Sequence, residues 1–414
     1  MLQVLKNTWA LQTGILLLML GNGMQGTLLG VRGSHEDMQA GVMSWIISAY
    51  FLGFLGGSRL APVLIGRVGH VRVFAALGSL ISAVLILFAA FPDPYVWFVL
   101  RIIVGFCFSG VYVVAESWLN DGSTNETRGK VLSVYIVVLM VGLVAAQGLL
   151  NIGDPRGYFL FVISSVLVSI SFAPILLSVS PAPVFETASP MSLRKMIAVS
   201  PLGAFGSLCL GALFSALWGM GAVYGTEVGL DVRQISIFVA AIYVGGMLCQ
   251  YPLGWLSDRV DRRKLIAAAA AACAVTTGLY VLTGQNFTLL LAVAFVMGGI
   301  TNPLYSLIIA YTNDYLEPED MAAGAGGLIF IHGLGAIGGP LIVGWMLVEV
   351  GPSGFFLYIA GVSGFLALFA VFRMLVRATP DLDSAAVFTP LSQGSTPVAI
   401  DMAQEHALEQ LETE

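Results

Sequence analysis

Apolar runs of about twenty residues follow one another along almost the whole chain, and they restrict its fold more than any other feature. A helix of roughly 20 apolar residues is what crosses the hydrocarbon layer of a bilayer. Hydrophobic residues make up 57% of the sequence and charged residues only 10%, whereas soluble domains carry about 25% charge. The sequence therefore predicts an all-α membrane protein embedded in a lipid bilayer, and it argues against a soluble enzyme.

Twelve such runs predict twelve transmembrane helices, near residues 8–31, 41–64, 71–91, 95–118, 129–151, 156–178, 200–224, 234–255, 264–284, 287–311, 322–348 and 353–376. Lys and Arg are unevenly distributed between the two sides of this arrangement. Fourteen of the 18 lie on one side, three lie on the other, and Arg101 lies inside a span. Because basic residues mark cytoplasmic loops, both termini are predicted to be cytoplasmic.

A dense cluster of charge interrupts the apolar runs in the second half of the chain, in the segment Gly254-Trp-Leu-Ser-Asp-Arg-Val-Asp-Arg-Arg263. It contains Asp258, Arg259 and Arg262. Charge of this density cannot remain in hydrocarbon, so the segment must be a tight turn at the membrane surface. The turn therefore separates the eighth span from the ninth.

The chain contains an internal repeat. A shift of 192 residues places Gly53 on Gly245 and Gly66 on Asp258, so the turn after the second span is a degenerate copy of the later turn. Such repeats are typical of transporters built from two related halves. We expect two pseudo-symmetric six-helix bundles, one over residues 1–178 and one over residues 199–378. Residues 179–198 are expected to form the linker between them, and residues 379–414 an acidic tail.

The turn at residues 254–263 resembles the signature loop of the major facilitator superfamily. The fourth span and its continuation, from Arg101-x3-Gly105 through Glu116-Ser117-Trp118, together with Pro303-Leu-Tyr305, look like the YcaD-like branch of bacterial permeases in that superfamily. The resemblance runs from the first span to the last and leaves out the tail. It implies a monomeric transporter of the bacterial inner membrane that works by alternating access. The fifth span lacks the proline of the drug-efflux branches, which makes a multidrug exporter less favoured.

No cofactor, metal or nucleic acid is expected as a partner. The four cysteines, Cys107, Cys209, Cys249 and Cys273, lie in apolar runs and have neither metal-ligand nor disulfide spacing. No basic patch is interleaved with aromatic residues. The expected partner is a small-molecule substrate.

Arg101 is the first candidate for that substrate, because a charge about 9 Å inside a span is costly and usually faces a cavity or a partner. It would bind an anionic group or tune a nearby acid; alternatively, it is a structural post bonded to backbone carbonyls. The other candidates for substrate contact or coupling are polar and aromatic residues inside spans, each of which could equally serve as an interhelical hydrogen bond: Asn22, Gln25, Gln147, Trp218, Tyr224, Tyr243, Asn302, Tyr305 and His332.

Glu116 lies fifteen residues, roughly 22 Å, further along the same helix than Arg101, so the two are not a direct pair. Its expected partners are Arg128 or the basic turn at Arg67 and Arg72. A gating role, proton carriage and a plain surface acid remain open for it.

The resemblance implies that Asp258 faces the start of the fifth span, near Gly129. Its counterpart Gly66 carries no acid. We therefore predict a swapped latch for the outward-open state, in which Arg67 or Arg72 meets the acids before the eleventh span: Glu317, Glu319 and Asp320.

The substrate and the coupling remain open at this level. Acidic residues are absent from the deep parts of the predicted spans, which weakens symport through a buried carboxylate. A small anionic or zwitterionic organic solute is the first expectation. A hydrophobic solute for efflux, and a channel-like or sensor protein of the same fold, are the alternatives. The Ser/Thr/Pro-rich tail is expected to be disordered, with a short docking helix over residues 398–411 as the second possibility.

Overall fold

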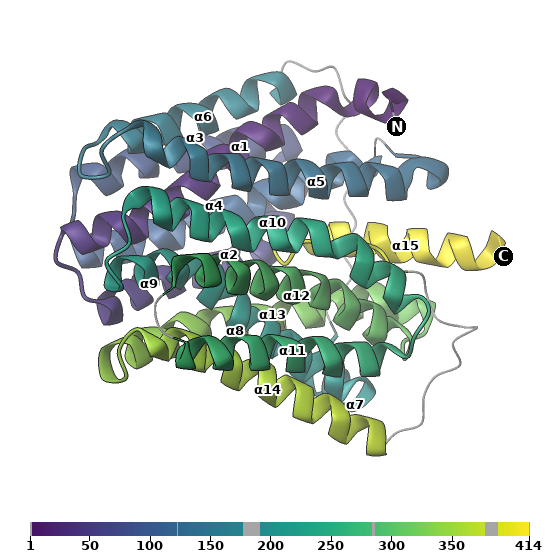
Figure 1. The fold of residues 1–414 in the computed structure, drawn as a ribbon. Helices are drawn as coiled ribbons and strands as arrows, with labels where there is room; N and C mark the ends of the chain where they lie inside the picture. The colour runs from purple at the N-terminus through teal and green to yellow at the C-terminus, as the bar shows by residue number, and fades with distance from the viewer. Residues whose placement is uncertain (1, 122, 177–190, 284–285, 377–387, 414) are drawn as a thin grey trace.

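The computed structural model describes residues 2–121, 123–176, 191–283, 286–376 and 388–413. It is a bundle of long helices (Figure 1). The first half contains α1 (Leu2–His35), α2 (Ala40–Val68), α3 (His70–Ala90), α4 (Pro94–Asp121), α5 (Asn125–Leu149) with the short η1 (Leu150–Ile152), and α6 (Phe159–Leu176). In the described residues, eleven helices are long and apolar enough to cross a membrane, and α6 is a shorter apolar helix.

The second half begins after the short helix α7 (Leu193–Val199). It contains α8 (Pro201–Ser215), the π-helical stretch η2 (Ala216–Met220), α9 (Gly221–Glu227), α10 (Val232–Ser257), α11 (Arg262–Leu282), α12 (Phe287–Asn313), α13 (Pro318–Glu349) and α14 (Ser353–Val376), and it is followed by α15 (Pro397–Thr413). The all-helical prediction is thus confirmed. The predicted seventh span is three consecutive pieces, α8, η2 and α9.

Capping residues set several helix ends. The Asp231 side chain accepts the backbone N–H of Gln234 at the start of α10, and the Asp261 side chain does the same for Arg263 at the start of α11. Gly69 ends α2 with a φ of 86°, a left-handed conformation that favours glycine. These caps satisfy backbone groups that a helix end leaves open.

The internal repeat is visible in the packing of both halves. In the first, a Cβ on Gly53 would collide with the carbonyl oxygen of Ile102, and one on Gly105 with that of Tyr50. In the second, Gly245 meets Phe295 in the same way, and Gly298 meets Ile242. The four contacts form two equivalent pairs, and each residue of a pair is separated from its counterpart by 192 or 193 positions. Glycine is therefore what allows α2 to approach α4, and α10 to approach α12.

The two halves contact each other along α2 and α13, where Arg59 lies 4.1 Å from the centroid of the Phe330 ring. They also touch directly at one end of the bundle. There Asn151 donates a hydrogen bond of 3.1 Å to Ser236, and Gly344 of α13 packs on Ser44 of α2. The start of α1 and the end of α15 both lie at the other end, which we call the termini end (Figure 1). There α15 packs against α4, α5 and α13, so it lies between the halves.

The tail was expected to be disordered, and this expectation is wrong for its described part. Residues 397–413 form α15, a longer helix than the alternative over 398–411. Ala399, Ile400 and Met402 are fully buried. The sequence favours this helix only as the second possibility, because its apolar face is short and its hydrogen-bond partners Asn313 and Met321 lie more than 80 residues away in the sequence.

The glycine contacts generate a stability prediction. Gly53→Ala should destabilise the protein by about 1–3 kcal/mol, because backbone must move to admit the methyl group. Gly56→Ala on the same helix is the control: a Cβ there meets nothing within 4 Å, so it should be neutral or slightly stabilising. Thermal unfolding of the purified variants in detergent measures both. Equal melting temperatures would contradict the close helix contact.

Candidate functional site

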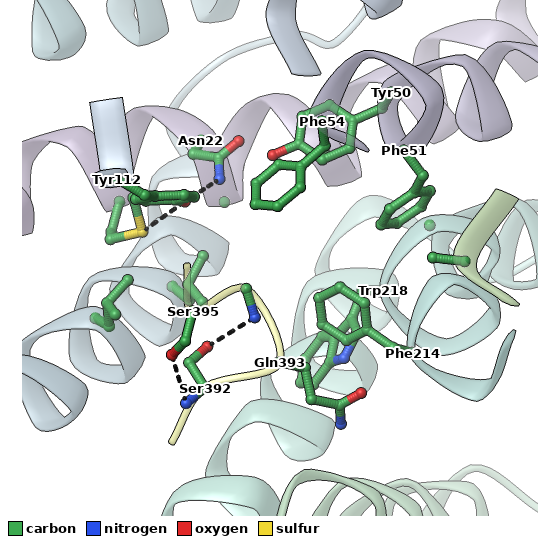
Figure 2. Close-up of a pocket in the computed structure, with 18 of the residues that line it drawn as sticks. Asn22, Tyr50, Phe51, Phe54, Tyr112, Phe214, Trp218, Ser392, Gln393 and Ser395 are labelled. Carbon is green, nitrogen blue, oxygen red and sulfur yellow. Dashed lines mark hydrogen bonds between the residues drawn. The ribbon is translucent and has the colours of Figure 1, made fainter. Parts of the chain in front are cut away.

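A pocket lies between the two halves, near the middle of the bundle. From the first half it is lined by α1, α2, α4 and α5, and from the second by α8, η2, α10, α12 and α13. Residues 392–395, just before α15, complete the lining at the termini end (Figure 2). Eight of the residues predicted for substrate contact or coupling lie here: Asn22, Gln25, Arg101, Trp218, Tyr243, Asn302, Tyr305 and His332.

Arg101 is buried, with 6% of its surface exposed, and its guanidinium lines the pocket. The guanidinium carbon lies 4.6 Å from the centroid of the Tyr50 ring, and Nη1 donates to Gln25 Oε1 at 3.3 Å. Within the described part of the chain, Arg101 Nε and Gln25 Nε2 are buried without a hydrogen-bond partner. A buried donor without a partner is costly, so these two groups point to a ligand that accepts hydrogen bonds.

Amide side chains add a second kind of contact. Asn22 donates to the Tyr112 hydroxyl at 3.1 Å, which in turn donates to the Met19 sulfur at 3.4 Å. On the other half, Asn302 donates to Gln250 at 3.3 Å. Amides carry both donors and acceptors, so these two positions can recognise an uncharged polar group on either side of a bound molecule.

Aromatic rings form much of the remaining wall. Trp218 stacks on Tyr243 with 4.0 Å between ring centroids, and Trp218 also contacts Phe214 at 5.9 Å. Phe214 meets Phe51 of the first half, again at 5.9 Å (Figure 2). The π-helical stretch η2 carries Trp218, and such stretches are frequent at functional sites because they re-aim a side chain. The pocket thus presents flat apolar faces together with one guanidinium.

Two of the predicted pocket residues lie elsewhere. Tyr224 stacks on Phe355 at 4.9 Å in an aromatic cluster that does not line the pocket. Gln147 accepts a hydrogen bond of 2.9 Å from Thr27 and ties α5 to α1. Neither residue lines the pocket, and both make contacts between helices, which is the alternative left open from the sequence.

Several residues that line the pocket are not among those predicted from the sequence. Tyr50 and Phe54 are spaced i, i+4 on α2, and Tyr112 and Tyr135 face them from α4 and α5. The spacing of Tyr50 and Phe54 was a readable signal, because residues four apart share a helix face. Nothing in the sequence indicated that residues 392–395 would reach the pocket.

Glu116 is buried, with 1% exposed, and its partners differ from those expected. One carboxylate oxygen accepts the Tyr135 hydroxyl at 2.8 Å, and the other accepts the Thr396 backbone N–H at 3.0 Å together with the Thr396 hydroxyl. Arg128 instead pairs with Glu405 of α15 at 3.1 Å. The expected pairing of Glu116 with Arg128 is therefore wrong for this structure, because the tail supplies a different partner to each: Thr396 to Glu116 and Glu405 to Arg128.

The turn at residues 254–263 is held by ion pairs within its own half. Arg262 is buried and lies 2.6 Å from Asp314. Arg263 lies 2.9 Å from Asp261. Burial alone would raise the pKa of Asp261, but hydrogen bonds from Arg263 and the charges of Arg263 and Lys264 lower it below its usual range.

The remaining residues of the turn contact the tail and the turn itself. Asp258 accepts the backbone N–H of Phe388 at 2.9 Å, so the contact with the start of α5 that the resemblance implied is replaced by the tail. Arg259 donates to the carbonyl of Trp255 at 2.9 Å and lies over its ring.

The swapped latch stays a prediction, since it concerns the other conformation. In this structure Asp320 pairs with Lys195 at 2.8 Å, and Glu317 is the residue before α13. Arg67 and Arg72 are exposed. The side chain of Glu319 lies outside the described residues.

The family Major Facilitator Superfamily matches residues 12–195 and 203–400. An uncharacterized MFS-type transporter of Yersinia pestis is 24% identical over 370 residues, which cover 89% of this chain and 94% of the relative. The uncharacterized MFS-type transporter YcaD of Salmonella arizonae is 25% identical, over 88% of this chain and 94% of the relative.

Solved structures agree on the fold. The nucleoside transporter NupG has a TM-score of 0.72 and 14% identity, over 88% of this chain and 98% of that chain. A mutant of NupG has a TM-score of 0.76 and 15% identity, over 89% of this chain and 100% of that one. At such low identity the likeness concerns the fold alone.

The ion pair of Arg262 gives a prediction about the turn. Asp314→Ala should destabilise the protein by about 3 kcal/mol, because it removes the carboxylate that faces a buried guanidinium. Asp320→Ala is the matched control: its pair with Lys195 is half-exposed, so less than about 1 kcal/mol should be lost. Thermal unfolding measures both variants. An equal effect of the two substitutions would contradict a structural role for the buried pair.

Proposed function

Because this chain belongs to the Major Facilitator Superfamily, we propose that it is a secondary transporter that moves a small organic solute by alternating access across the bacterial inner membrane. The pocket between the halves, with Arg101 in its wall, is the observation that supports this best. The halves meet at the end opposite the termini, and basic residues gather at the termini end. Since basic residues mark the cytoplasmic side, we infer cytoplasmic termini, and with that orientation halves that meet at the opposite end make an inward-facing arrangement.

The solute is an anion or a zwitterion with a flat or apolar body. Arg101 Nε and Gln25 Nε2 offer donors for a carboxylate or another acceptor group, and Arg101 supplies the positive charge. Trp218 and Tyr243 provide a stacking surface for the body of the solute. A purely hydrophobic solute would leave the buried guanidinium of Arg101 without compensation, which disfavours efflux of hydrophobic compounds.

A second candidate is an uncharged solute with a planar polar ring, such as a nucleoside. The aromatic stack and the amides Asn22 and Asn302, on opposite halves, favour it. The structurally similar NupG is a nucleoside transporter. In this alternative Arg101 would bind a carbonyl or hydroxyl oxygen in place of a charged group.

Proton coupling through a carboxylate would have to use a group outside the pocket wall, because the residues that line it in the described chain include His332 but no carboxylate. Glu116 is the nearest link: Tyr135 lines the pocket and donates to it. We assign Glu116 a gating role, in which its partner at the termini end changes when the halves rock.

The proposal is tested by thermal stabilisation against a panel of organic anions, amino acids, nucleosides and drug-like cations. A bound ligand raises the melting temperature by mass action. An anionic or zwitterionic hit should bind Arg101→Ala at least tenfold more weakly, a loss of about 1.4 kcal/mol or more. Arg259→Ala, an exposed arginine outside the pocket, should bind as the wild type does.

The other outcomes are also informative. A nucleoside hit that depends on Trp218 and Asn302 would support the second candidate, and Arg101→Ala should weaken it as well, because the guanidinium would hold a carbonyl or hydroxyl oxygen. Absence of stabilisation by every compound, with Arg101→Ala merely less stable, would leave Arg101 as a structural post and count against the proposed pocket.

A further inference from the structure

The segment 388–405, which we call the tail plug, contacts both halves at the termini end. On the second half, the Leu391 N–H donates to Ser306 Oγ at 2.9 Å, and Gln393 Nε2 donates to the Thr301 carbonyl at 2.9 Å. On the first half, Thr396 donates to Glu116 through its N–H and its hydroxyl. The plug therefore ties α12 to α4 through itself.

The two ends of the tail plug are also held by charged residues from different halves. The Phe388 N–H is held by Asp258 at the end of α10, and Glu405 is held by Arg128 of α5. Asp258 and Arg128 carry opposite charges on opposite halves, and the plug occupies both. A direct approach of the two halves at this end would have to displace it.

The contacts are buried and specific. Leu391, Thr396, Ala399 and Ile400 are each at most 1% exposed, and Gln404 donates to Asn313 at 2.9 Å. The tip of the plug, residues 392–395, forms the pocket wall at the termini end (Figure 2). The pocket is thus closed at one end by direct packing of the halves and at the other by the plug.

Length and charge allow the plug to leave. Eleven residues, 377–387, connect α14 to Phe388, and such a segment can span up to about 36 Å when extended. Asp401 is partly buried beside Glu405, so docking carries an electrostatic cost. Both features suit a segment that docks reversibly.

We propose that residues 388–405 are a built-in inhibitory plug, which occupies the cytoplasmic opening of the inward-facing transporter, covers the pocket and keeps the halves from closing on the cytoplasmic side. The proposal rests on the transport function proposed above. Transport would then require the plug to withdraw, and the acidic tail would control activity from within the same chain.

The test uses the full chain in a background with its four cysteines replaced. Spin labels on cysteines introduced at positions 68 and 264, exposed sites at the termini end of the two halves, report the distance between the halves. In a second sample, the labelling rate of a cysteine introduced at buried position 399 reports docking. The distance and the labelling rate are each measured with the unsubstituted tail, with Ile400→Asp and with the conservative control Ile400→Val.

With the unsubstituted tail and with Ile400→Val, position 399 should be protected and one long distance should dominate. Ile400→Asp should speed labelling at least tenfold and add a population with a shorter distance. Rapid labelling of the unsubstituted tail, or rapid labelling of Ile400→Asp with unchanged distances, would overturn the proposal. If Ile400→Asp leaves position 399 protected, the double variant Thr396→Arg with Ile400→Asp is measured by the same criteria. Thermal stabilisation by ligands tests binding in the pocket and does not depend on movement of the plug. A failure of the proposed function can therefore be distinguished from a failure of the plug proposal.

Docking should also depend on pH through Asp401. Burial, then the neighbouring Glu405, raises the pKa of Asp401, while Arg128 of α5 lowers it. The other facing groups are Glu116 on α4, held by Thr396, and the Met321 carbonyl on α13, held by Gln404. Because the docked pKa lies above the undocked one, protonation favours docking, and this contribution disappears as pH rises through the docked pKa.

Labelling at position 399 should therefore accelerate with rising pH more than labelling at exposed position 68, which corrects for thiol chemistry. Asp401→Asn should stay protected across the range. Equal pH profiles of labelling for Asp401→Asn and for the protein with Asp401 would show that Asp401 does not control the pH dependence of docking.

Discussion

A carboxylate buried in a membrane bundle must find hydrogen-bond donors inside the protein, and at Glu116 the chain's own tail supplies them. Tyr135 satisfies one oxygen and Thr396 the other. Thr396 belongs to the tail, so this hydrogen bond holds the tail against α4. The same requirement explains the Arg262–Asp314 pair and the contact of Arg101 with Gln25 and Tyr50.

The two halves remain equivalent at glycines where helix backbones touch, but they differ at the charged residues of the turns. Gly53 and Gly245 are equivalent by sequence and make equivalent backbone contacts, because a side chain in either place would separate two helices. The turns that follow have diverged: Asp258 has Gly66 as its counterpart. A packing constraint is therefore shared by the halves, whereas the charges of the two turns are not, and the tail binds the second half through Asp258 but the first half through Arg128 and Glu116.

This division also explains how far the sequence could predict the structure. Spans, halves and the pocket position of Arg101 follow from length, repeat and the cost of a buried charge, which are local properties. Tyr224 was misplaced because an all-apolar helix gives no pattern that separates its pocket face from its packed face; it lies among Phe238, Phe355 and Phe356. Docking of the tail could be given only as the alternative to disorder, because its partners are distant in sequence and its composition matches that of an unfolded segment.

The position of the tail changes the meaning of the charged residues at the termini end. The resemblance implied that Asp258 meets the start of α5, where Arg128 and Gly129 lie. In the structure Asp258 holds Phe388 and Arg128 holds Glu405, so both sides of that expected contact are engaged by one segment. A state in which the halves close here needs these groups back. Withdrawal of the tail would free Asp258, Arg128 and Glu116 together, which couples release of the pocket wall to the charges that the closed state would use.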